Sequence, residues 1–313
     1  MKNTKFEKFW DNIFPKIRPW LFLSPFILFV LVFSVYPVLR SISLAFMQDY
    51  NRLTGNYNGI GWGNFEGIFK SRDFKNAILN SSLYAVMVVP IGLVISLFFA
   101  SLLNKRLKGT AIYQTAFFLP LVTSTVAIGF VWRFMFNGNY GVLNSILSIF
   151  GVDKIKWLED SRYSLTTIVI YGIWSSIPFS TIVLLSAMQS INKKYYIIAR
   201  MDNASSFQMF KKITLPMMMP TIIILMFLNL ISSFKVFDEL QVFFGGPGPY
   251  SNLYTIVWYI YEQMRTGIYG VGYAAAASIV LFVFVLSATL LLVLIRKVWL
   301  NRGKRLVRSK RNA

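Results

Sequence analysis

Six long stretches without a charged side chain constrain the fold of this chain more than any other feature. They are 20–39, 76–104, 109–132, 163–192, 213–234 and 266–295. Each has at least the roughly 20 residues that an α-helix needs to cross about 30 Å of hydrocarbon. The apolar runs are continuous rather than alternating, which disfavours a β-barrel. We therefore expect an all-α membrane protein with six transmembrane helices.

The charged residues indicate the orientation of these helices. The net charge is +20, and 21 of the 32 Lys and Arg residues, against three of the 12 acids, fall in 1–19, 104–111, 190–212 and 296–313. These segments share one side of a six-helix topology, so the positive-inside rule places both termini in the cytoplasm. The same distribution favours contact with anionic lipid over nucleic-acid binding.

The chain divides into three parts by composition. We expect residues 1–19 to form a cytoplasmic amphipathic segment, although a frayed tail remains an alternative. Residues 20–297 form the membrane domain, which begins with a span that is not cleaved as a signal peptide. Residues 298–313 form a basic cytoplasmic tail. Of the inner loops that connect two spans, 190–212 is the longest.

The residue inventory disfavours enzymatic chemistry. The chain has no cysteine and no histidine, which removes the commonest nucleophile, general base and metal ligands. Adjacent acids occur only at Glu159–Asp160 and Asp238–Glu239, and the phosphate-binding motif G-x-x-x-x-G-K-[ST] is missing. We therefore expect no catalytic residue, metal or cofactor on this chain, and the reading as a membrane glycosyl or lipid transferase is disfavoured.

The loop 190–212 carries signals for two short helices joined by an elbow. Lys193–Met201 suits a helix, and Asp202–Asn203 ends it, because Asn tolerates the left-handed conformation beyond a helix end. The sequence S-x-x-Q from Ser205 to Gln208 is a capping box that starts a second helix. A docking surface explains these features better than a solvated loop that only connects two spans, which remains the alternative.

This segment resembles the EAA loop of ATP-binding-cassette (ABC) importer permeases. The residues that match that pattern are Ala199, Asp202, Ala204, Ile213, Leu215 and Pro216. Ile197, Ile198 and Asn203 stand where the pattern has Glu, Ala and Gly. The resemblance implies that the loop docks on a separate ATPase, through the coupling residues Tyr195, Ile198, Ala199, Asp202, Asn203, Ala204, Phe207, Leu215 and Pro216.

The resemblance covers nearly the whole chain and is to the sugar-permease branch of these importers. Stretches in matching order include GWGNFEGIF, TAFFLPLVTS, IWSSIPF and FKVFDELQVFFGGPGP. It implies a type I ABC importer permease fold in the bacterial inner membrane and a heterodimer with a second six-span permease. The other implied partners are two ATPase subunits, which would hold ATP and Mg, and an extracytoplasmic solute-binding protein that delivers an oligosaccharide.

The family's maltose permease suggests where a sugar would bind. Carried onto matching positions, its contacts give Leu121, Thr125, Gly172, Ser175, Ser176, Phe179, Ser232 and Lys235. Polar groups inside spans are costly unless they face the bundle or a cavity, which agrees with this set. For each Ser and Thr, helix packing or a bond to its own helix is the alternative.

Lys235 has two interpretations. It lies three and four residues before Asp238 and Glu239, which suits an intrahelical ion pair. Alternatively, it faces the cavity and binds an acidic saccharide. A stand-alone secondary transporter or channel is the alternative function for the whole chain, but the six stretches contain no Asp, Glu or His that could form an ion relay.

Overall fold

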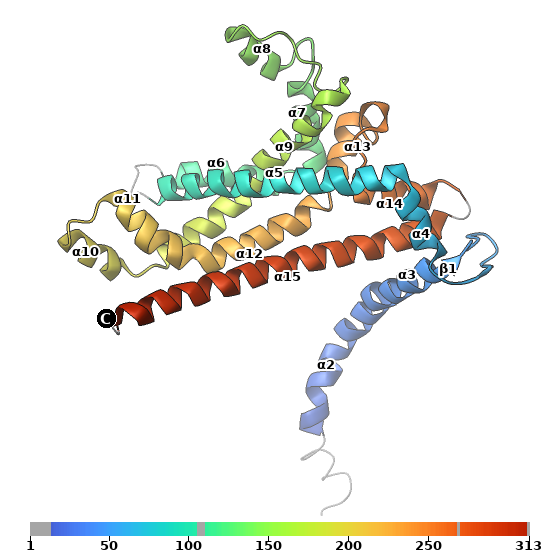
Figure 1. Ribbon diagram of the computed structural model, residues 1–313, viewed down its shortest axis with the longest axis horizontal. Helices are drawn as coiled ribbons and strands as arrows, with labels where there is room; N and C mark the ends of the chain where they lie inside the picture. Colours follow the sequence, from blue (N-terminus) through green and yellow to red (C-terminus); the bar gives the residue numbers. More distant parts are fainter. Residues whose placement is uncertain (1–13, 105–109, 268–269, 312–313) are drawn as a thin grey trace, which may run out of the picture. The chain divides into compact units, whose positions relative to one another are not determined.

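The computed structural model describes residues 14–104, 110–267 and 270–311, which are almost entirely helical (Figure 1). The chain forms two compact units. Unit 1 comprises residues 1–68 and 263–279, and unit 2 comprises residues 69–262 and 280–313. Most of the predicted amphipathic segment 1–19 and of the inner turn near residue 105 lies outside the described residues.

Unit 1 begins with one long apolar helix that is widened in its middle. It runs through α2 (Phe14–Val30), the π-helical turn η2 (Leu31–Val35) and α3 (Tyr36–Phe46). Pro37 has no N–H group and its ring crowds the carbonyl four residues earlier. The Tyr36 N–H accordingly bonds to the Leu31 carbonyl, five residues back. The proline therefore widens this helix without ending it.

A short segment with two strands and one helix follows this helix in unit 1. Strands β1 (Met47–Gln48) and β2 (Gly59–Ile60) pair antiparallel and precede α4 (Gly63–Lys70). Buried Asn64 donates hydrogen bonds to the carbonyls of Ala45 and Met47, at 3.0 and 2.9 Å. These bonds satisfy carbonyls at the end of α3 and hold α4 against it.

Unit 2 contains most of the helices. They are α5 (Arg72–Leu103), α6 (Thr110–Val122), α7 (Thr125–Met135), α8 (Val142–Ile149), α9 (Ser161–Gln189), α10 (Lys193–Met201), α11 (Ser206–Met209), η3 (Phe210–Thr214), α12 (Leu215–Ser233), α13 (Asp238–Phe244) and η4 (Pro249–Ser251). Helix α14 (Ile256–Arg265) ends in unit 1, and α15 (Gly270–Arg311) begins there and continues in unit 2.

The core of unit 2 is a three-helix contact of α5, α9 and α12. Its apolar centre includes Leu93, Leu184 and Leu225. Small residues let the helices approach closely, as is common in membrane bundles. A Cβ atom added at Gly172 of α9 would overlap the phenol of Tyr84 on α5.

One of the six expected spans forms as two helices. The stretch 109–132 is divided into α6 and α7, and Ser124 between them has ψ near 127°. Pro120 cannot donate a helical hydrogen bond, and the β-branched residues that follow have reduced helix propensity. The stretch therefore does not continue as one straight helix, and it forms the two shorter helices α6 and α7.

The other five stretches each coincide with a long apolar helix. Of the described residues, Lys16–Phe46, Arg72–Leu103, Ser161–Gln189, Ser206–Ser233 and Gly270–Leu291 are long and apolar enough to cross a membrane. The number of spans and the side of the termini stay predictions. The backbone of α15 is helical to Arg311, so residues 298–311 of the expected basic tail continue the last helix.

Two asparagines, the buried Asn144 and the half-buried Asn252, organise loops of unit 2. Asn144 on α8 donates to the carbonyls of Gly138 and Ile155, both at 2.8 Å. Its oxygen accepts from the N–H of Ile155 and from Trp157 Nε1. Because these partners lie in the loops on both sides of α8, this side chain ties the two loops between α7 and α9 together.

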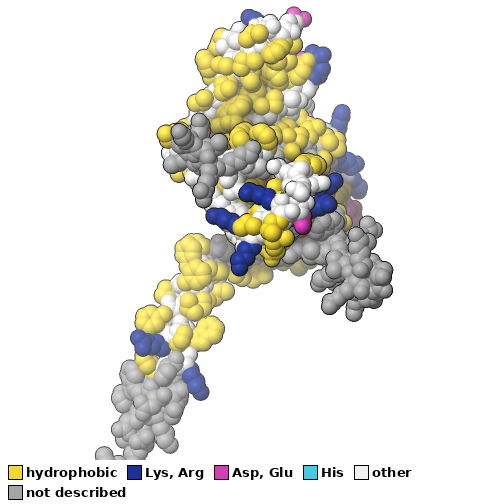
Figure 2. All heavy atoms as spheres, turned by 90° about the vertical axis from the view of Figure 1, so that its left-hand side faces the viewer, with side chains coloured by type: hydrophobic (Ala, Val, Ile, Leu, Met, Phe, Trp, Pro, Cys, Tyr) yellow, Lys and Arg dark blue, Asp and Glu magenta, His cyan; other side chains and the backbone are white. Residues whose placement is uncertain are grey.

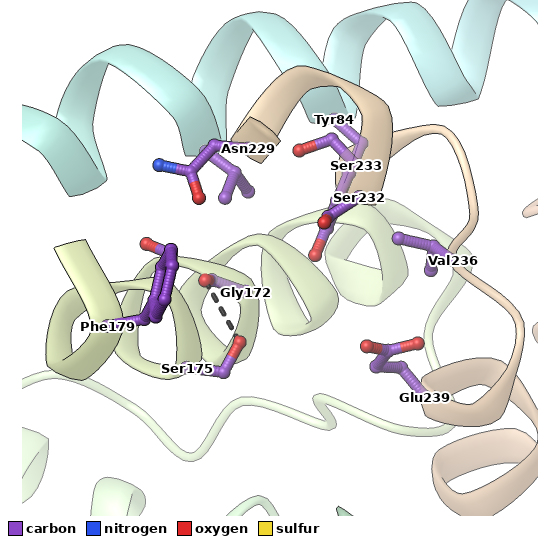
Figure 3. A pocket seen from close by; sticks show the side chains of 11 residues that line it. Tyr84, Gly172, Ser175, Phe179, Asn229, Ser232, Ser233, Val236 and Glu239 are labelled. Atoms are coloured by element: carbon purple, nitrogen blue, oxygen red, sulfur yellow. Dashed lines mark hydrogen bonds between the residues drawn. The ribbon is translucent and has the colours of Figure 1, made fainter. Parts of the chain in front are cut away.

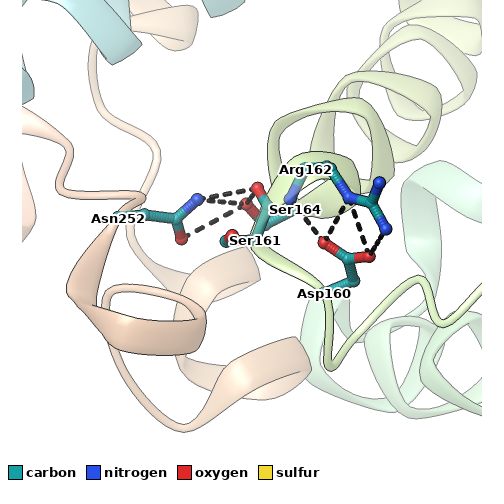
Figure 4. Close-up of polar contacts among 5 residues, drawn as sticks. All are labelled: Asp160, Ser161, Arg162, Ser164 and Asn252. Carbon is teal, nitrogen blue, oxygen red and sulfur yellow. Dashed lines mark hydrogen bonds and ion pairs between the residues drawn. The ribbon is translucent and has the colours of Figure 1, made fainter.

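Asn252 performs the same role at the start of α9 (Figure 4). Its amide donates to the Ser161 carbonyl at 2.7 Å and to Ser164 Oγ at 3.0 Å. Beside it, Asp160 caps the helix by accepting from the Arg162 N–H, and the two side chains form an ion pair. The hydrogen bonds from Arg162 lower the pKa of the half-buried Asp160 carboxyl.

Candidate functional site

Two adjoining cavities lie among the helices of unit 2, each with a volume of about 270 Å³. The first, which we name the α12 cavity, is bounded by α5, α9, α12 and α13. The second, named the α7 cavity, is bounded by α6, α7, α9 and α13. Ser175 and Glu239 line both. Together the two cavities fall within the range of roughly 300–1,000 Å³ that small-molecule sites occupy.

Breaks and kinks in the helices create this space. The α7 cavity opens where α6 ends and α7 begins, and it is lined there by Pro120, Thr123 and Thr125. Helix α13 is held against α7 because Arg133 donates to the Val242 carbonyl at 3.2 Å and Gly129 leaves room for the Val242 side chain. This packing brings Glu239, on the same short helix, to both cavities.

The polar side chains in the α12 cavity are partly satisfied within the protein. Ser175 and Ser176 donate to the carbonyls of Gly172 and Ile173, at 3.2 and 2.8 Å. Asn229 of α12 donates to Ser180 of α9 at 3.1 Å. A hydroxyl that donates once can still accept, so these groups are able to receive hydrogen bonds from the hydroxyls of a ligand.

Seven of the eight residues predicted to contact sugar line these cavities. Leu121 and Thr125 line the α7 cavity, Ser175 lines both, and the α12 cavity contains Gly172, Ser176, Phe179 and Ser232 (Figure 3). Phe179 and Glu239 lie on opposite sides of the α12 cavity. A flat aromatic face and several hydroxyl acceptors are the groups that a sugar ring requires.

Lys235 is the exception. Its side chain is exposed, and it is not among the residues that line either cavity. No carboxylate of the described residues lies within 4.0 Å of its ammonium, so the ion pair with Asp238 or Glu239 does not form here either. Lys235 lies just beyond the end of α12, directly after the capping residue Phe234.

Two residues that line the cavities, Tyr84 and Glu239, were not predicted from the sequence to contact a sugar. Tyr84 is 4% exposed, lies against Gly172, and its hydroxyl has no hydrogen-bond partner among the described residues. Tyr84 lies in an uncharged span, where the polar hydroxyl of a tyrosine is expected to face the other helices rather than lipid. This position could have indicated from the sequence that Tyr84 lines a cavity. Glu239 was assigned only as an ion-pair partner for Lys235. Burial raises the pKa of Glu239, and its neighbour Asp238 contributes in the same direction.

The loop 190–212 has the local structure that the sequence predicts. Helix α10 ends at Met201, Asn203 adopts the left-handed conformation with φ of 53°, and α11 starts at Ser206. Ser205 and Gln208 form the reciprocal hydrogen bonds of a capping box. The elbow is therefore a built structure whose bend is set by Asn203.

Apolar side chains project from this elbow into solvent. The exposed fraction is 58% for Ile198, 78% for Met201 and 71% for Phe207. Figure 2 looks onto the end of the molecule that carries α10 and α11, where Lys and Arg side chains surround hydrophobic ones. Exposed apolar patches of this kind are common where proteins interact with one another.

The other predicted coupling residues support the elbow or lie beside this patch. Tyr195, Asp202 and Pro216 are exposed, whereas Ala199, Ala204 and Leu215 are half-buried. The Ala204 N–H donates to the Ala199 carbonyl at 2.9 Å, which closes the turn.

The elbow is bonded to the helix that follows it. Tyr196 of α10 and Thr214 of η3 share a hydrogen bond of 2.8 Å between their hydroxyls. The η3 turn is a second proline-induced widening: Leu215 bonds to the carbonyl of Phe210, five residues back, next to Pro216. Helix α12 then continues to Asn229 and Ser232 in the α12 cavity, so one continuous helical path joins elbow and cavity.

The chain is similar to known sugar permeases along most of its length. Residues 59–299 match the family described as "Binding-protein-dependent transport system inner membrane component". The chain is 32% identical to the trehalose/maltose transport system permease protein MalF of Thermococcus litoralis, over 87% of this chain and 90% of that protein. It is 31% identical to the arabinooligosaccharides transport system permease protein AraP of Halalkalibacterium halodurans, over 92% and 90%.

Solved structures give the same result. The fold matches a chain of a bacterial ABC transporter involved in the import of the acidic polysaccharide alginate, with a TM-score of 0.77 and 26% identity, over 93% of this chain and 99% of that one. The match to the alginate transporter in complex with its alginate pentasaccharide-bound periplasmic protein has the same TM-score, with 28% identity, over 90% and 96%. The chain belongs to the family of binding-protein-dependent transport system inner-membrane components, as an all-α permease of the ABC importer sugar-permease branch.

Proposed function

We propose that this chain is the permease subunit of an ABC importer that takes up an oligosaccharide from an extracytoplasmic solute-binding protein. It forms a heterodimer with a second six-span permease, and two ATPase subunits bind ATP and Mg beneath them. The α12 and α7 cavities form this chain's share of the sugar pathway. The elbow 190–212 is the surface on which an ATPase subunit docks.

The observation that carries this proposal is the exposed apolar surface of the elbow. Aromatic and long apolar side chains that dock in a partner's cleft supply most of the energy of an interface. Phe207 and Met201 are placed for that role, on short helices whose ends are satisfied by Asn203 and the Ser205 capping box. A linker between two spans requires neither feature.

The bonded path from the elbow supports a mechanism for coupling. When the ATPase subunits close on ATP, they displace the elbow. The Tyr196–Thr214 hydrogen bond and the η3 turn transmit that displacement to α12. Because α12 carries Asn229 and Ser232, its movement alters the α12 cavity and exposes it alternately to the two sides of the membrane.

Reconstitution of the assembly tests this proposal. The chain is co-expressed with the genes beside it, purified through a tag, and assayed in proteoliposomes for ATP hydrolysis stimulated by the binding protein with each member of an oligosaccharide panel. We expect co-purification of a second permease and an ATPase, and stimulation by at least one oligosaccharide. Uptake by this chain alone, driven by an ion gradient without ATP, would overturn the proposal.

Variants of the elbow test the docking surface directly. Loss of a buried aromatic anchor at an interface costs about 2 kcal/mol or more, so Phe207→Ala should weaken ATPase association by roughly 30-fold. Leu53→Ala is the control, because Leu53 is 80% exposed in a loop of unit 1. Equal association for Phe207→Ala, Leu53→Ala and wild type would exclude the elbow as the docking surface.

A further inference from the structure

The two cavities contain one carboxylate and no cationic side chain among their described lining residues. The carboxylate is that of Glu239, which reaches from α13 into the same space as Ser175 and Ser232 (Figure 3). Because Glu239 lines both cavities, a ligand that occupies either one lies close to this group. Among the described residues of this chain, a single one therefore sets the charge of these cavities.

Glu239 has no charged partner within the described protein. No Lys or Arg nitrogen lies within 4.0 Å of its carboxylate in the part of the chain that the structure describes. Lys235 is exposed, and Arg133, which holds α13 in place, donates to the Val242 carbonyl instead. A partly buried carboxylate without a counter-charge is costly, so its natural partners are the hydrogen-bond donors of a ligand.

We propose that Glu239 selects the charge of the transported glycan, so that this importer takes neutral or amino-bearing oligosaccharides and rejects uronate- or sulfate-bearing ones. This inference rests on the proposed function. Sugar hydroxyls donate to the Glu239 carboxylate, while Ser175, Ser176 and Ser232 accept from other hydroxyls and Phe179 contacts a ring face.

The electrostatic magnitude is large enough to determine selectivity. Two like unit charges about 6 Å apart, at an effective dielectric constant of about 20, repel by an amount equal to roughly a hundredfold in an equilibrium constant. A uronate within either cavity would lie at about this range from Glu239, because Glu239 lines both. The alginate importer takes an acidic polysaccharide, and at 26% identity its cavity residues are free to differ.

The test uses the reconstituted assembly with its binding protein and a panel of neutral and uronate-bearing oligosaccharides of equal length. For each sugar, we measure the dissociation constant from the binding protein and the stimulated ATPase activity. Glu239→Gln keeps the shape and removes the charge. Asp238→Asn removes an adjacent, exposed acid that does not line either cavity, and it is the matched control.

We expect wild type and Asp238→Asn to favour the neutral sugar at equal occupancy of the binding protein. Glu239→Gln should raise the activity ratio of acidic to neutral sugar by at least tenfold. Because the binding protein is identical in all assays, such a change belongs to the permease. Where the binding protein accepts only neutral sugars, thermal-shift titration of the permease assembly with both sugars supplies the ratio.

Some outcomes would overturn this inference and leave the proposed function intact. These are wild-type activity that is highest with acidic glycans, or a ratio that Glu239→Gln does not alter. A binding protein that accepts only uronate-bearing sugars would also overturn it. If no oligosaccharide of either charge stimulates the assembly, the proposed function itself fails.

Discussion

Substitution of Gly172 by Ala should destabilise the bundle and impair transport, although Ala is the better helix former. In an unobstructed helix the change would stabilise by about 0.5–1 kcal/mol. Here the new methyl group would overlap the Tyr84 hydroxyl and lie 2.8 Å from Cζ of that ring. Tyr84 is 4% exposed, so its ring is enclosed by neighbouring side chains and cannot give way without disturbing them. Overpacking of this kind costs about 1–3 kcal/mol, so we expect a net loss of about 1–2 kcal/mol.

The pair Gly172→Ala and Tyr84→Phe forms a double-mutant cycle. Tyr84→Phe removes the atom nearest to the new methyl group, so it should recover about half of the loss, with a coupling energy of about 0.5–1 kcal/mol. The assay is the apparent melting temperature of the purified assembly in detergent, together with sugar uptake. Gly59→Ala is the control, because no atom lies within 4 Å of a Cβ atom built there.

Equal melting temperatures for Gly172→Ala and wild type would contradict this prediction, because α5 and α9 would then not be packed as closely as in the structure. The prediction is also refuted if the effects of Gly172→Ala and Tyr84→Phe simply add. Since Gly172 lines the α12 cavity, uptake should fall in Gly172→Ala even in preparations that remain assembled.

Three further predictions concern the loops. Asn144→Ala should cost about 2–4 kcal/mol, because the four polar groups that pair with this buried amide lose their hydrogen bonds, whereas Asn139→Ala, at an exposed position nearby, should be nearly neutral in the same melting assay. Asn203→Gly should keep stability within about 0.5 kcal/mol and retain coupled ATPase activity, whereas Asn203→Val should lose about 1–2 kcal/mol, since a β-branched residue fits a φ of 53° poorly. The ion pair with Arg162 lowers the pKa of Asp160 in the folded protein. The stabilisation from this ion pair is therefore present above about pH 4, and it is lost as the pH falls through the lowered pKa. Asp160→Asn should remove this part of the acid dependence, which is measured as melting temperature against pH.

Each of these predictions has a distinct contradicting result. Similar melting temperatures for Asn144→Ala and Asn139→Ala would mean that the α8 loop is not fixed by the buried amide. Loss of coupling in Asn203→Gly would show that the Asn side chain itself, rather than its backbone conformation, is needed. An unchanged acid profile for Asp160→Asn would mean that the Arg162 ion pair is too screened to affect folding.

The sequence alone determined the membrane helices and the elbow. Uncharged runs of 20 or more residues have few ways to satisfy their backbone in lipid other than helix formation, so five of the six stretches coincide with long helices. The elbow was predictable for a different reason, since helix caps are local. Ser205, Gln208 and Asn203 act on backbone groups within a few residues, and no distant contact is required.

The tertiary structure decided which polar residues share a cavity. Lys235 and Glu239 lie in the short segment after α12, where a few residues of local sequence do not indicate which side chain reaches a cavity. The packing of α13 on α7 settles this by placing Glu239 at both cavities, while Lys235 stays exposed. The close contact of Gly172 with Tyr84 depends on how α5 and α9 meet, and the break between α6 and α7 opens the second cavity. These features arise from contacts between segments far apart in the chain, which local sequence signals do not encode.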